Sequence, residues 1–137
     1  MNEPPDSHVE ARRWVEKAEH DLRNAECVLA LADDCPTDTV CFHCQQCAEK
    51  YLKSLLVARG VEFPRTHDLV MLLNLTASAV GLNLRMEQVQ PLNRYSVEVR
   101  YPGEWEAIDL EEAAEALEAA RAVREAVRNL LPADALL

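Results

Sequence analysis

The chain has few aromatic residues and no long apolar run. Only seven of its 137 residues are Phe, Trp or Tyr, although 49% are hydrophobic, and alanine and leucine dominate. This composition favours packed helices over β-sheet. No apolar stretch approaches the roughly 20 residues that cross a bilayer, and residues 1–13 contain no apolar core of a secretory signal. We therefore expect a cytoplasmic protein that does not engage a membrane.

The chain is also poor in basic charge. Its net charge of −10 argues against general affinity for nucleic acid, which requires a basic face. The charge is uneven, at −7 over residues 1–49, +3 over residues 50–100 and −6 over residues 101–137. The middle third is therefore where a phosphate is expected to be best accommodated. The acidic outer segments are most simply interpreted as solvated helix faces.

Helical periodicity accounts for most of the sequence, which has the length of one domain, residues 1–137. We expect residues 1–6 to be frayed and a capping box to begin the first helix at Ser7. The other helices are predicted from Thr37 or Asp38 to Gly60, over 68–79, over 87–99 with Pro91 in the first turn, and from Asp109 to about Leu131. The prediction is an all-α, up-and-down bundle of four or five helices.

The segment 38–68 organises the rest of the chain. At 100° per residue, eight side chains fall within one apolar arc of roughly 140°: Cys41, Cys44, Cys47, Ala48, Tyr51, Leu52, Leu55 and Ala58. A polar set takes the opposite side: Gln45, Gln46, Glu49, Lys50 and Lys53. Because Leu56 and Val57 lie outside the arc, apolar neighbours are expected on more than one side. Gly60 is placed to end this helix, and Thr66 is predicted to cap the next.

The first helix carries one apolar stripe: Trp14, Ala18, Leu22, Ala25 and Leu29. Trp14 could serve as a platform for a ligand. Its place in the stripe favours core packing instead.

The five cysteines, with His43 among them, suggest a metal site at first sight. However, Cys41 and Cys47 are about 9 Å apart along a helix axis, whereas the sulfurs of one zinc lie about 4 Å apart. All three helical cysteines, Cys44 included, also point into the apolar arc. We therefore expect reduced thiols that pack in the core, with metal or redox work as the alternative, and we expect no metal and no cofactor.

Five polar residues are candidates for a binding site. Arg100 and Tyr101 precede Pro102, which favours extended backbone and could direct both side chains into a cleft with Arg94. Arginine suits phosphate, and tyrosine can stack on a base. Lys53 and His67 are possible contributors.

Two of these candidates also have simpler structural readings. His67, at a helix start, could act as a base or bind phosphate, or could anchor the turn by a hydrogen bond. Arg94 could instead pair with Glu98 at i,i+4 on a helix surface.

Several motifs in this order resemble the HEPN domains of bacteria and archaea. They are Trp14-x2-Lys17-Ala18-x2-Asp21-Leu22, then Cys44-Gln45-Gln46-Cys47-Ala48-Glu49-Lys50-Tyr51-Leu52-Lys53-Ser54-Leu55-Leu56, Gly60, Thr66-His67-Asp68-Leu69 and Arg100-Tyr101-Pro102. The resemblance covers nearly the whole chain. It implies an up-and-down helical bundle, a homodimer, and a gene beside a small nucleotidyltransferase in a toxin–antitoxin-like pair. Nucleotide binding was proposed in naming the family.

Many relatives in that family are metal-independent ribonucleases. The resemblance implies a motif of arginine, four to six residues, histidine and, two residues later, tyrosine. Here Arg94 and Tyr101 match, but Val99 stands in the place of the histidine. Valine cannot transfer a proton, so the acid–base half of RNA cleavage is missing.

The sequence therefore predicts a non-catalytic, nucleotide- or partner-binding helical module that accompanies a small nucleotidyltransferase. The expected site comprises Arg94, Arg100 and Tyr101, with Lys53 and His67 as contributors. One alternative is a metal-independent ribonuclease whose base has moved to His67. Another is a purely structural, dimeric interaction protein.

Overall fold

The computed structural model describes residues 4–96 and 107–136, which form an all-helical bundle without a strand among them. The α-helices are α1 (Asp6–Leu29), α2 (Thr37–Ala58), α3 (Leu69–Ala79), α4 (Met86–Val89) and α5 (Leu110–Arg128). Short 3₁₀ helices lie at η1 (Ala32–Asp34), η2 (Gln90–Tyr95) and η3 (Ala133–Ala135). The predicted fold class is confirmed. No helix within these ranges is long and apolar enough to cross a membrane.

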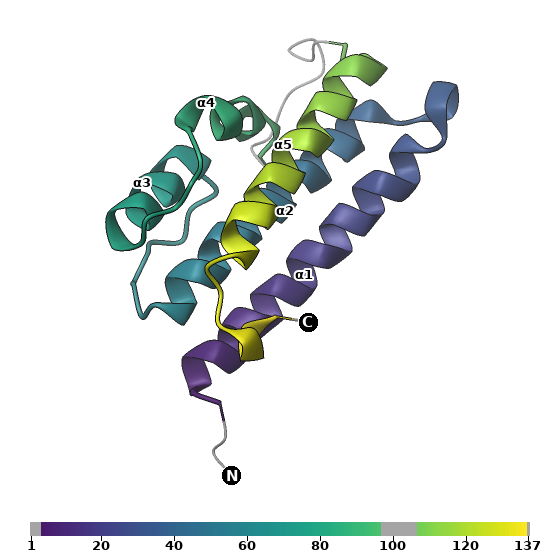
Figure 1. The fold of residues 1–137 in the computed structure, drawn as a ribbon. Coiled ribbons are helices and arrows are strands. Elements are labelled where there is room, and N and C mark those ends of the chain that lie inside the picture. The colour runs from purple at the N-terminus through teal and green to yellow at the C-terminus, as the bar shows by residue number, and fades with distance from the viewer. Residues whose placement is uncertain (1–3, 97–106, 137) are drawn as a thin grey trace.

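The helix α2 lies at the centre of the bundle (Figure 1). It packs against α1 on one flank, against α3 and η2 on the other, and against α5 across its front. Two hydrogen bonds set the direction of α5 along α2. Thr37 Oγ1 donates to the Ile108 carbonyl at 2.7 Å, and Arg59 donates to the Leu130 carbonyl at 3.1 Å. The two helices therefore run parallel, with α3 and α4 carrying the chain back between them.

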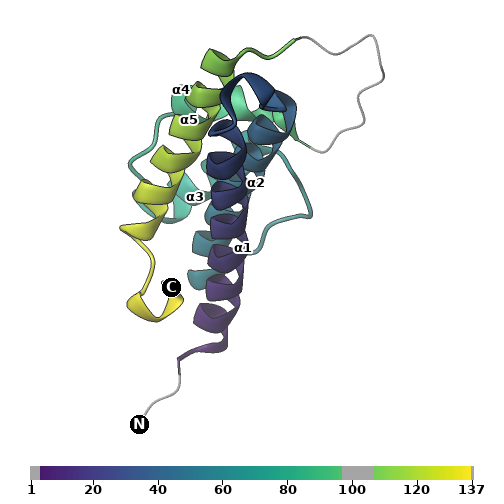
Figure 2. The same cartoon turned by 90° about the vertical axis from the view of Figure 1, so that its right-hand side faces the viewer.

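The described ends of the chain meet at one end of the bundle (Figures 1 and 2). His8, in the first turn of α1, lies against Asp134 of η3, with Nδ1 2.8 Å from Oδ1. This contact joins the C-terminal 3₁₀ turn to α1.

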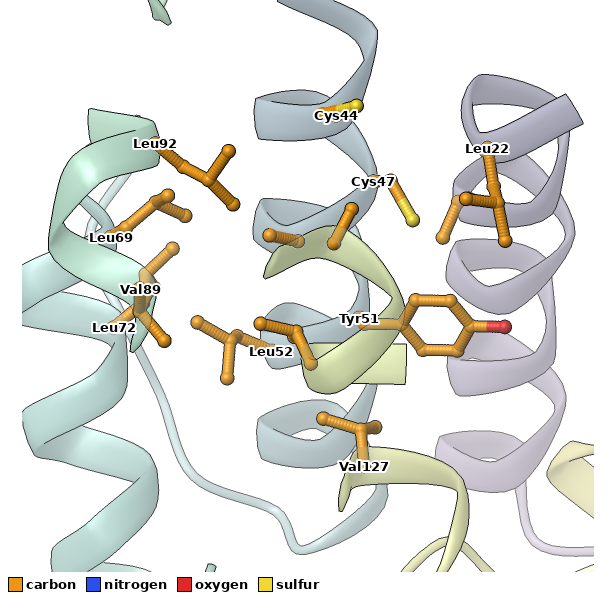
Figure 3. Packing of buried hydrophobic residues seen from close by; sticks show 14 of the residues in the cluster. Leu22, Cys44, Cys47, Tyr51, Leu52, Leu69, Leu72, Val89, Leu92 and Val127 are labelled. Carbon is orange, nitrogen blue, oxygen red and sulfur yellow. The ribbon is translucent and has the colours of Figure 1, made fainter. Parts of the chain in front are cut away.

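The core is built mainly from small and branched side chains (Figure 3). All three α2 cysteines, Tyr51, Leu52 and Leu55 are fully buried. The buried residues of α1 are Ala11, Val15, Ala18, Asp21, Leu22 and Ala25. The register of this stripe was predicted correctly except at its ends, where Trp14 and Leu29 are half-buried.

The helix ends confirm some predicted caps and correct others. Asp109 caps α5 as expected, accepting from the Glu112 amide at 2.8 Å. The predicted box at Ser7 is wrong, because α1 begins at Asp6 after Pro5 and no side chain caps it. The cap of α3 is Asp68, whose Oδ1 accepts from the amides of Val70 and Met71.

Two other expectations need correction. Thr66 accepts the amide hydrogen of Asp68 at 3.0 Å and so shapes the turn ahead of α3 instead of capping the helix. The long helix predicted over 87–99 is shorter and of two kinds. The α-helix α4 ends at Val89, and Pro91 lies in the first turn of the 3₁₀ helix that follows. Residues 97–99 lie outside the described ranges.

Candidate functional site

Glu49 of α2 is a buried carboxylate that joins Lys53 and His67. Its side chain is 3% exposed, and each of its oxygens has a cationic or imidazole partner. His67 Nδ1 lies 2.8 Å from Oε1, and the Lys53 ammonium lies 3.0 Å from Oε2. Two candidates that are 14 positions apart in the sequence therefore meet on one carboxylate. The glutamate itself was not among the predicted site residues.

Two glutamines fix the segment that carries His67. The Gln45 side-chain amide donates to the His67 carbonyl at 3.1 Å and to Glu49 at 3.2 Å. Gln46 donates to the Gln45 side-chain oxygen at 2.7 Å. Both glutamines are buried. The polar side of α2 is therefore covered by the turn ahead of α3, and the hydrogen bonds satisfy the groups that this cover removes from water.

Lys53 is enclosed by aromatic rings. Its ammonium lies 5.4 Å from the centre of the Trp14 ring and 5.9 Å from that of Phe63, within cation–π range. Only 8% of its side chain is exposed. This placement favours a structural role for Lys53. Trp14 is half-buried and contacts the Lys53 ammonium. The apolar stripe of the first helix had predicted core packing for Trp14 instead.

His67 remains accessible, with 55% of its side chain exposed. Its Nδ1 faces Glu49, so a carboxylate orients the imidazole while the rest of the ring meets solvent. The contact with Glu49 fits the interpretation of His67 as an anchor of the turn, and its role in binding or catalysis stays a prediction.

Arg94 lies in η2 and contacts α5. Its guanidinium forms a hydrogen-bonded ion pair with Glu112 and lies 5.0 Å from the centre of the Tyr95 ring. The Tyr95 hydroxyl donates to the same Glu112 oxygen. These two hydrogen bonds, that from Tyr95 foremost, lower the pKa of Glu112 below its usual value. Burial and the bond to Glu112 raise the pKa of the Tyr95 phenol.

A pocket of about 510 Å³ opens beside Arg94, between η2 and α5. We call it the acidic pocket, because four glutamates and one arginine line it: Glu87, Glu112, Glu115, Glu118 and Arg94. The rest of its wall includes Pro91, Leu92, Tyr95, Ala116, Ala119 and Ala122. The sequence hinted at this pocket only indirectly, through the acidic first turn of α5 and the tyrosine next to Arg94.

Arg100, Tyr101 and Val99 lie outside the described residues, as does Glu98, the predicted partner of Arg94. The proposed cleft that joins Arg94 to Arg100 and Tyr101 therefore stays a prediction. Within the described ranges, Arg94 pairs with Glu112.

The α2 cysteines are buried thiols. Burial raises the pKa of Cys41 to about 11 and that of Cys44 to about 12, and raises that of Cys47 well above its usual value. Such thiols are poor sources of the thiolate that binds metal or reacts. His43 turns to Asp21 instead, with Nδ1 2.8 Å from Oδ1. Among the described residues, no three His, Cys, Asp or Glu side chains are grouped to hold a metal ion.

The comparisons with known proteins agree with this bundle. Residues 11–130 match the sequence model of the HEPN domain. The chain belongs to the HEPN domain family. A crystal structure of TT1696 from Thermus thermophilus is similar to this HEPN domain at 33% identity and a TM-score of 0.69, covering 88% of this chain and 98% of that one.

A second solved structure, ST0689, is described as an archaeal HEPN homologue. It shares 23% identity and a TM-score of 0.66 with this HEPN domain, covering 89% of this chain and 98% of its own. At that identity the likeness concerns the fold alone. The search of curated proteins finds no match.

Proposed function

We propose that this HEPN domain is a non-catalytic module that binds a basic protein partner through the acidic pocket. The observation that carries the proposal is the lining of that pocket, in which four carboxylates surround an apolar wall. The one arginine there, Arg94, is already paired with Glu112, and Glu118 is paired with Arg121, so Glu87 and Glu115 are the lining carboxylates without an ion pair among the described residues. A lysine or arginine with an apolar stem matches such a surface, since its stem packs on the alanines while its charge meets the glutamates.

The same lining disfavours a nucleotide beside Arg94. A phosphate group placed there faces an excess of negative side chains, and like charges a few ångströms apart repel by about 1 kcal/mol or more even at high dielectric. Of the two ligands that the sequence leaves open for this site, the partner protein therefore fits better. The HEPN resemblance makes a small nucleotidyltransferase, in a cytoplasmic toxin–antitoxin-like pair, the first partner to test.

The test measures binding of this chain to a nucleotidyltransferase encoded beside it. Glu87 and Glu115 are exposed and line the pocket. We expect the Glu87→Gln/Glu115→Gln variant to bind the partner about tenfold more weakly in calorimetry, since rim charges at an interface govern steering and salt dependence.

The matched control is Glu10→Gln/Glu16→Gln, which removes the same charge from the exposed face of α1. This variant is expected to bind like the parent. Equal loss in both variants, or in neither, overturns the acidic pocket as the docking site.

A second candidate function rests on the pair formed by His67 and Glu49. A buried carboxylate 2.8 Å from the Nδ1 of an exposed imidazole is an arrangement that orients a general base. The displaced-base ribonuclease therefore predicts RNA cleavage without divalent ions that His67→Ala abolishes. Cleavage that persists in His67→Ala, or a parent protein without activity, counts against it.

The homodimer that the resemblance implies is part of the proposal. Sedimentation equilibrium of the purified chain is expected to give twice the 15.4 kDa mass of the protomer. A mass of one protomer at micromolar concentration excludes it, together with the purely structural dimer.

A further inference from the structure

A second hollow lies between α1 and α5, and its Arg121 forms an ion pair at 2.7 Å with Glu118 of the acidic pocket. Its volume is about 560 Å³, within the range of small-ligand sites. We call it the arginine cleft after four of its lining residues: Arg23, Arg121, Arg124 and Arg128. Three glutamates and an asparagine, with Leu22, complete the lining: Glu19, Glu26, Glu125 and Asn129. The cleft is thus lined by an excess of positive charge in a chain whose net charge is −10.

One part of the cleft lining is a hydrogen-bonded network around Glu19. Arg124 binds this carboxylate with two nitrogens, Nε at 2.9 Å and Nη2 at 3.0 Å. The hydroxyl of Tyr51 donates to it at 2.7 Å. Tyr51 is fully buried on α2, and its ring reaches across to α1 (Figure 3). Arg124 is therefore held in one orientation by Glu19.

Two of the four arginines are less engaged than Arg121 and Arg124, although the charge of Arg128 helps to lower the pKa of Glu19. Arg128 donates to the Tyr51 hydroxyl at 3.4 Å and forms no ion pair with a carboxylate in the part of the chain that the structure describes. Arg23 is exposed and makes no ion pair in those same ranges. Since each guanidinium carries five N–H donors, the cleft offers many more donors than its own carboxylates accept.

We propose that the arginine cleft binds the phosphate groups of a small phosphorylated ligand. Arg128 and Arg23 approach from α5 and α1 and supply the charge. Arg124, held by Glu19, and Asn129 line the same space and have further N–H groups to donate. Planar guanidinium groups match phosphate oxygens in pairs, and such charge-assisted bonds are stronger than neutral ones.

Ion pairing between helices is not a sufficient account of this site. If these arginines only joined α1 to α5, each would need its own carboxylate. Arg121 has one in Glu26, which lies 2.8 Å away. Arg23 lies on the same cleft and forms no ion pair within the described ranges, and Arg128 supports Glu19 only through its charge and its hydrogen bond to Tyr51. Their placement is explained by an anion that enters from solvent.

The experiment is calorimetric titration of the full chain with pyrophosphate, ATP and adenosine at about 50 mM salt, where screening is weak. We expect pyrophosphate and ATP to bind with Kd below about 1 mM and adenosine not to bind. ATP that binds like pyrophosphate indicates recognition of phosphate alone, and ATP that binds more than about tenfold tighter indicates a nucleoside subsite as well. Absence of pyrophosphate binding overturns the proposal.

Substitutions locate the site. Arg23→Gln/Arg128→Gln is expected to weaken pyrophosphate binding about tenfold or more, since each lost charge-assisted bond contributes about 1.5–3 kcal/mol. Arg12→Gln/Arg13→Gln removes the same charge from exposed positions on α1 and is expected to bind like the parent. Equal weakening in the two variants shows attraction by general charge and overturns the proposal.

The single variant Arg23→Gln guards against a folding defect in the double variant. Because Arg23 is exposed and forms no ion pair within the described ranges, its replacement leaves the bundle intact. Its binding is expected to fall about threefold or more, as expected for one charged contact at an exposed site. Binding equal to that of the parent excludes Arg23 from the site and contradicts the proposal. Glu87→Gln/Glu115→Gln tests the partner site separately.

Discussion

Glu49 shows how one side chain can organise a polar cluster inside a helical core. Both of its oxygens are in use, one toward Lys53 and one toward His67. Because Lys53 is enclosed by Trp14 and Phe63, its charge depends on this carboxylate instead of on water. The cluster of Glu49, Lys53 and His67 therefore holds the turn that precedes α3 against α2.

Replacing Glu49 with glutamine should destabilise the protein strongly. The amide keeps the shape of the carboxylate but leaves the Lys53 ammonium buried without a counter-charge. Removing one partner of a buried pair costs about 3–5 kcal/mol, which urea denaturation measures as a lower midpoint at an unchanged slope.

Two comparison variants separate this effect from a general loss of charge. Glu16→Gln, on the exposed face of α1, is expected to change the unfolding free energy by less than about 0.5 kcal/mol. Glu49→Gln/Lys53→Met is expected to be more stable than Glu49→Gln alone, since no unpaired charge remains. A loss below about 1 kcal/mol in Glu49→Gln would contradict the buried ion pair.

At the scale of elements, α2 explains both the success and the limit of the sequence prediction. Its apolar arc follows from 3.6-residue periodicity, and Cys44, Tyr51 and Leu55 are buried as that arc requires. Periodicity also marks Gln45 and Glu49 as the opposite, polar face. Nothing local shows that this face is buried too, because its cover comes from a turn some 20 residues later in the chain.

The N-cap of a helix could be predicted from the sequence where only one suitable capping residue precedes the helix. Asp109 is such a case, since a side chain with an acceptor precedes an acidic first turn. Near Thr66, two good cap residues stand two positions apart, and the choice of Asp68 depends on Asn93. The Asn93 amide donates to Asp68 at 3.1 Å, and its oxygen accepts from the Leu69 amide at 2.9 Å. Such a distant partner is invisible in the local sequence.

The end of α2 yields a sharp test of backbone conformation. Gly60 has φ of 70°, in the left-handed region, and a Cβ there would meet nothing within 4 Å. Gly60→Ala is therefore expected to destabilise the fold by about 1–2 kcal/mol through backbone strain alone.

Gly81 is the matched control, because it has the same open surroundings without a positive φ. Gly81→Ala is expected to be neutral or to stabilise by up to about 1 kcal/mol, since alanine restricts the unfolded chain. Thermal unfolding of both variants measures the difference. Equal effects at the two positions would exclude the left-handed helix end.

The contact between α1 and α5 predicts a pH dependence. Burial alone raises the pKa of Glu19, but hydrogen bonds from Arg124 and Tyr51 outweigh it and lower that pKa below 4.5. A group whose pKa is lower in the folded state stabilises the fold above its unfolded pKa, and this contribution is lost as the pH falls through the folded pKa.

Glu19→Gln is expected to lower the unfolding free energy by about 1–2 kcal/mol near neutral pH. The difference from the parent should stay constant from about pH 6 to 8 and shrink as the pH falls below about 4.5. Denaturant titrations at several pH values measure it. Glu26→Gln, in the exposed pair with Arg121, is expected to change stability by less than about 0.5 kcal/mol. A difference that grows on acidification would contradict the network.

At the scale of the whole molecule, charge along the sequence did not predict charge in space. The middle third carries +3, yet its Arg94 lies among glutamates that come mostly from the acidic last third. That last third also supplies three arginines to the cleft with α1. Helix periodicity separates the two sets, because Arg121, Arg124 and Arg128 follow one face of α5 while Glu115 and Ala119 lie on another. Only the packing of α5 in the bundle determines that the arginine face meets α1 and the glutamate face meets η2.

This separation leads to a prediction that distinguishes local from global electrostatics. Glu87→Gln/Glu115→Gln makes the chain less negative by two charges, and Arg23→Gln/Arg128→Gln makes it more negative by two. If the net charge governed anion binding, the first variant would bind pyrophosphate more tightly. If the arginine cleft governs it, that variant should bind within about twofold of the parent, because neither Glu87 nor Glu115 lines the cleft.

The measurement is calorimetric titration with pyrophosphate at two salt concentrations, near 50 and 150 mM. The cleft hypothesis expects the glutamate variant to follow the parent at both concentrations and the arginine variant to lose binding at both. A glutamate variant that binds several-fold tighter at low salt and like the parent at high salt would show long-range attraction instead. In that case the acidic residues of the whole surface, and not the four arginines between α1 and α5, would set the affinity for phosphate.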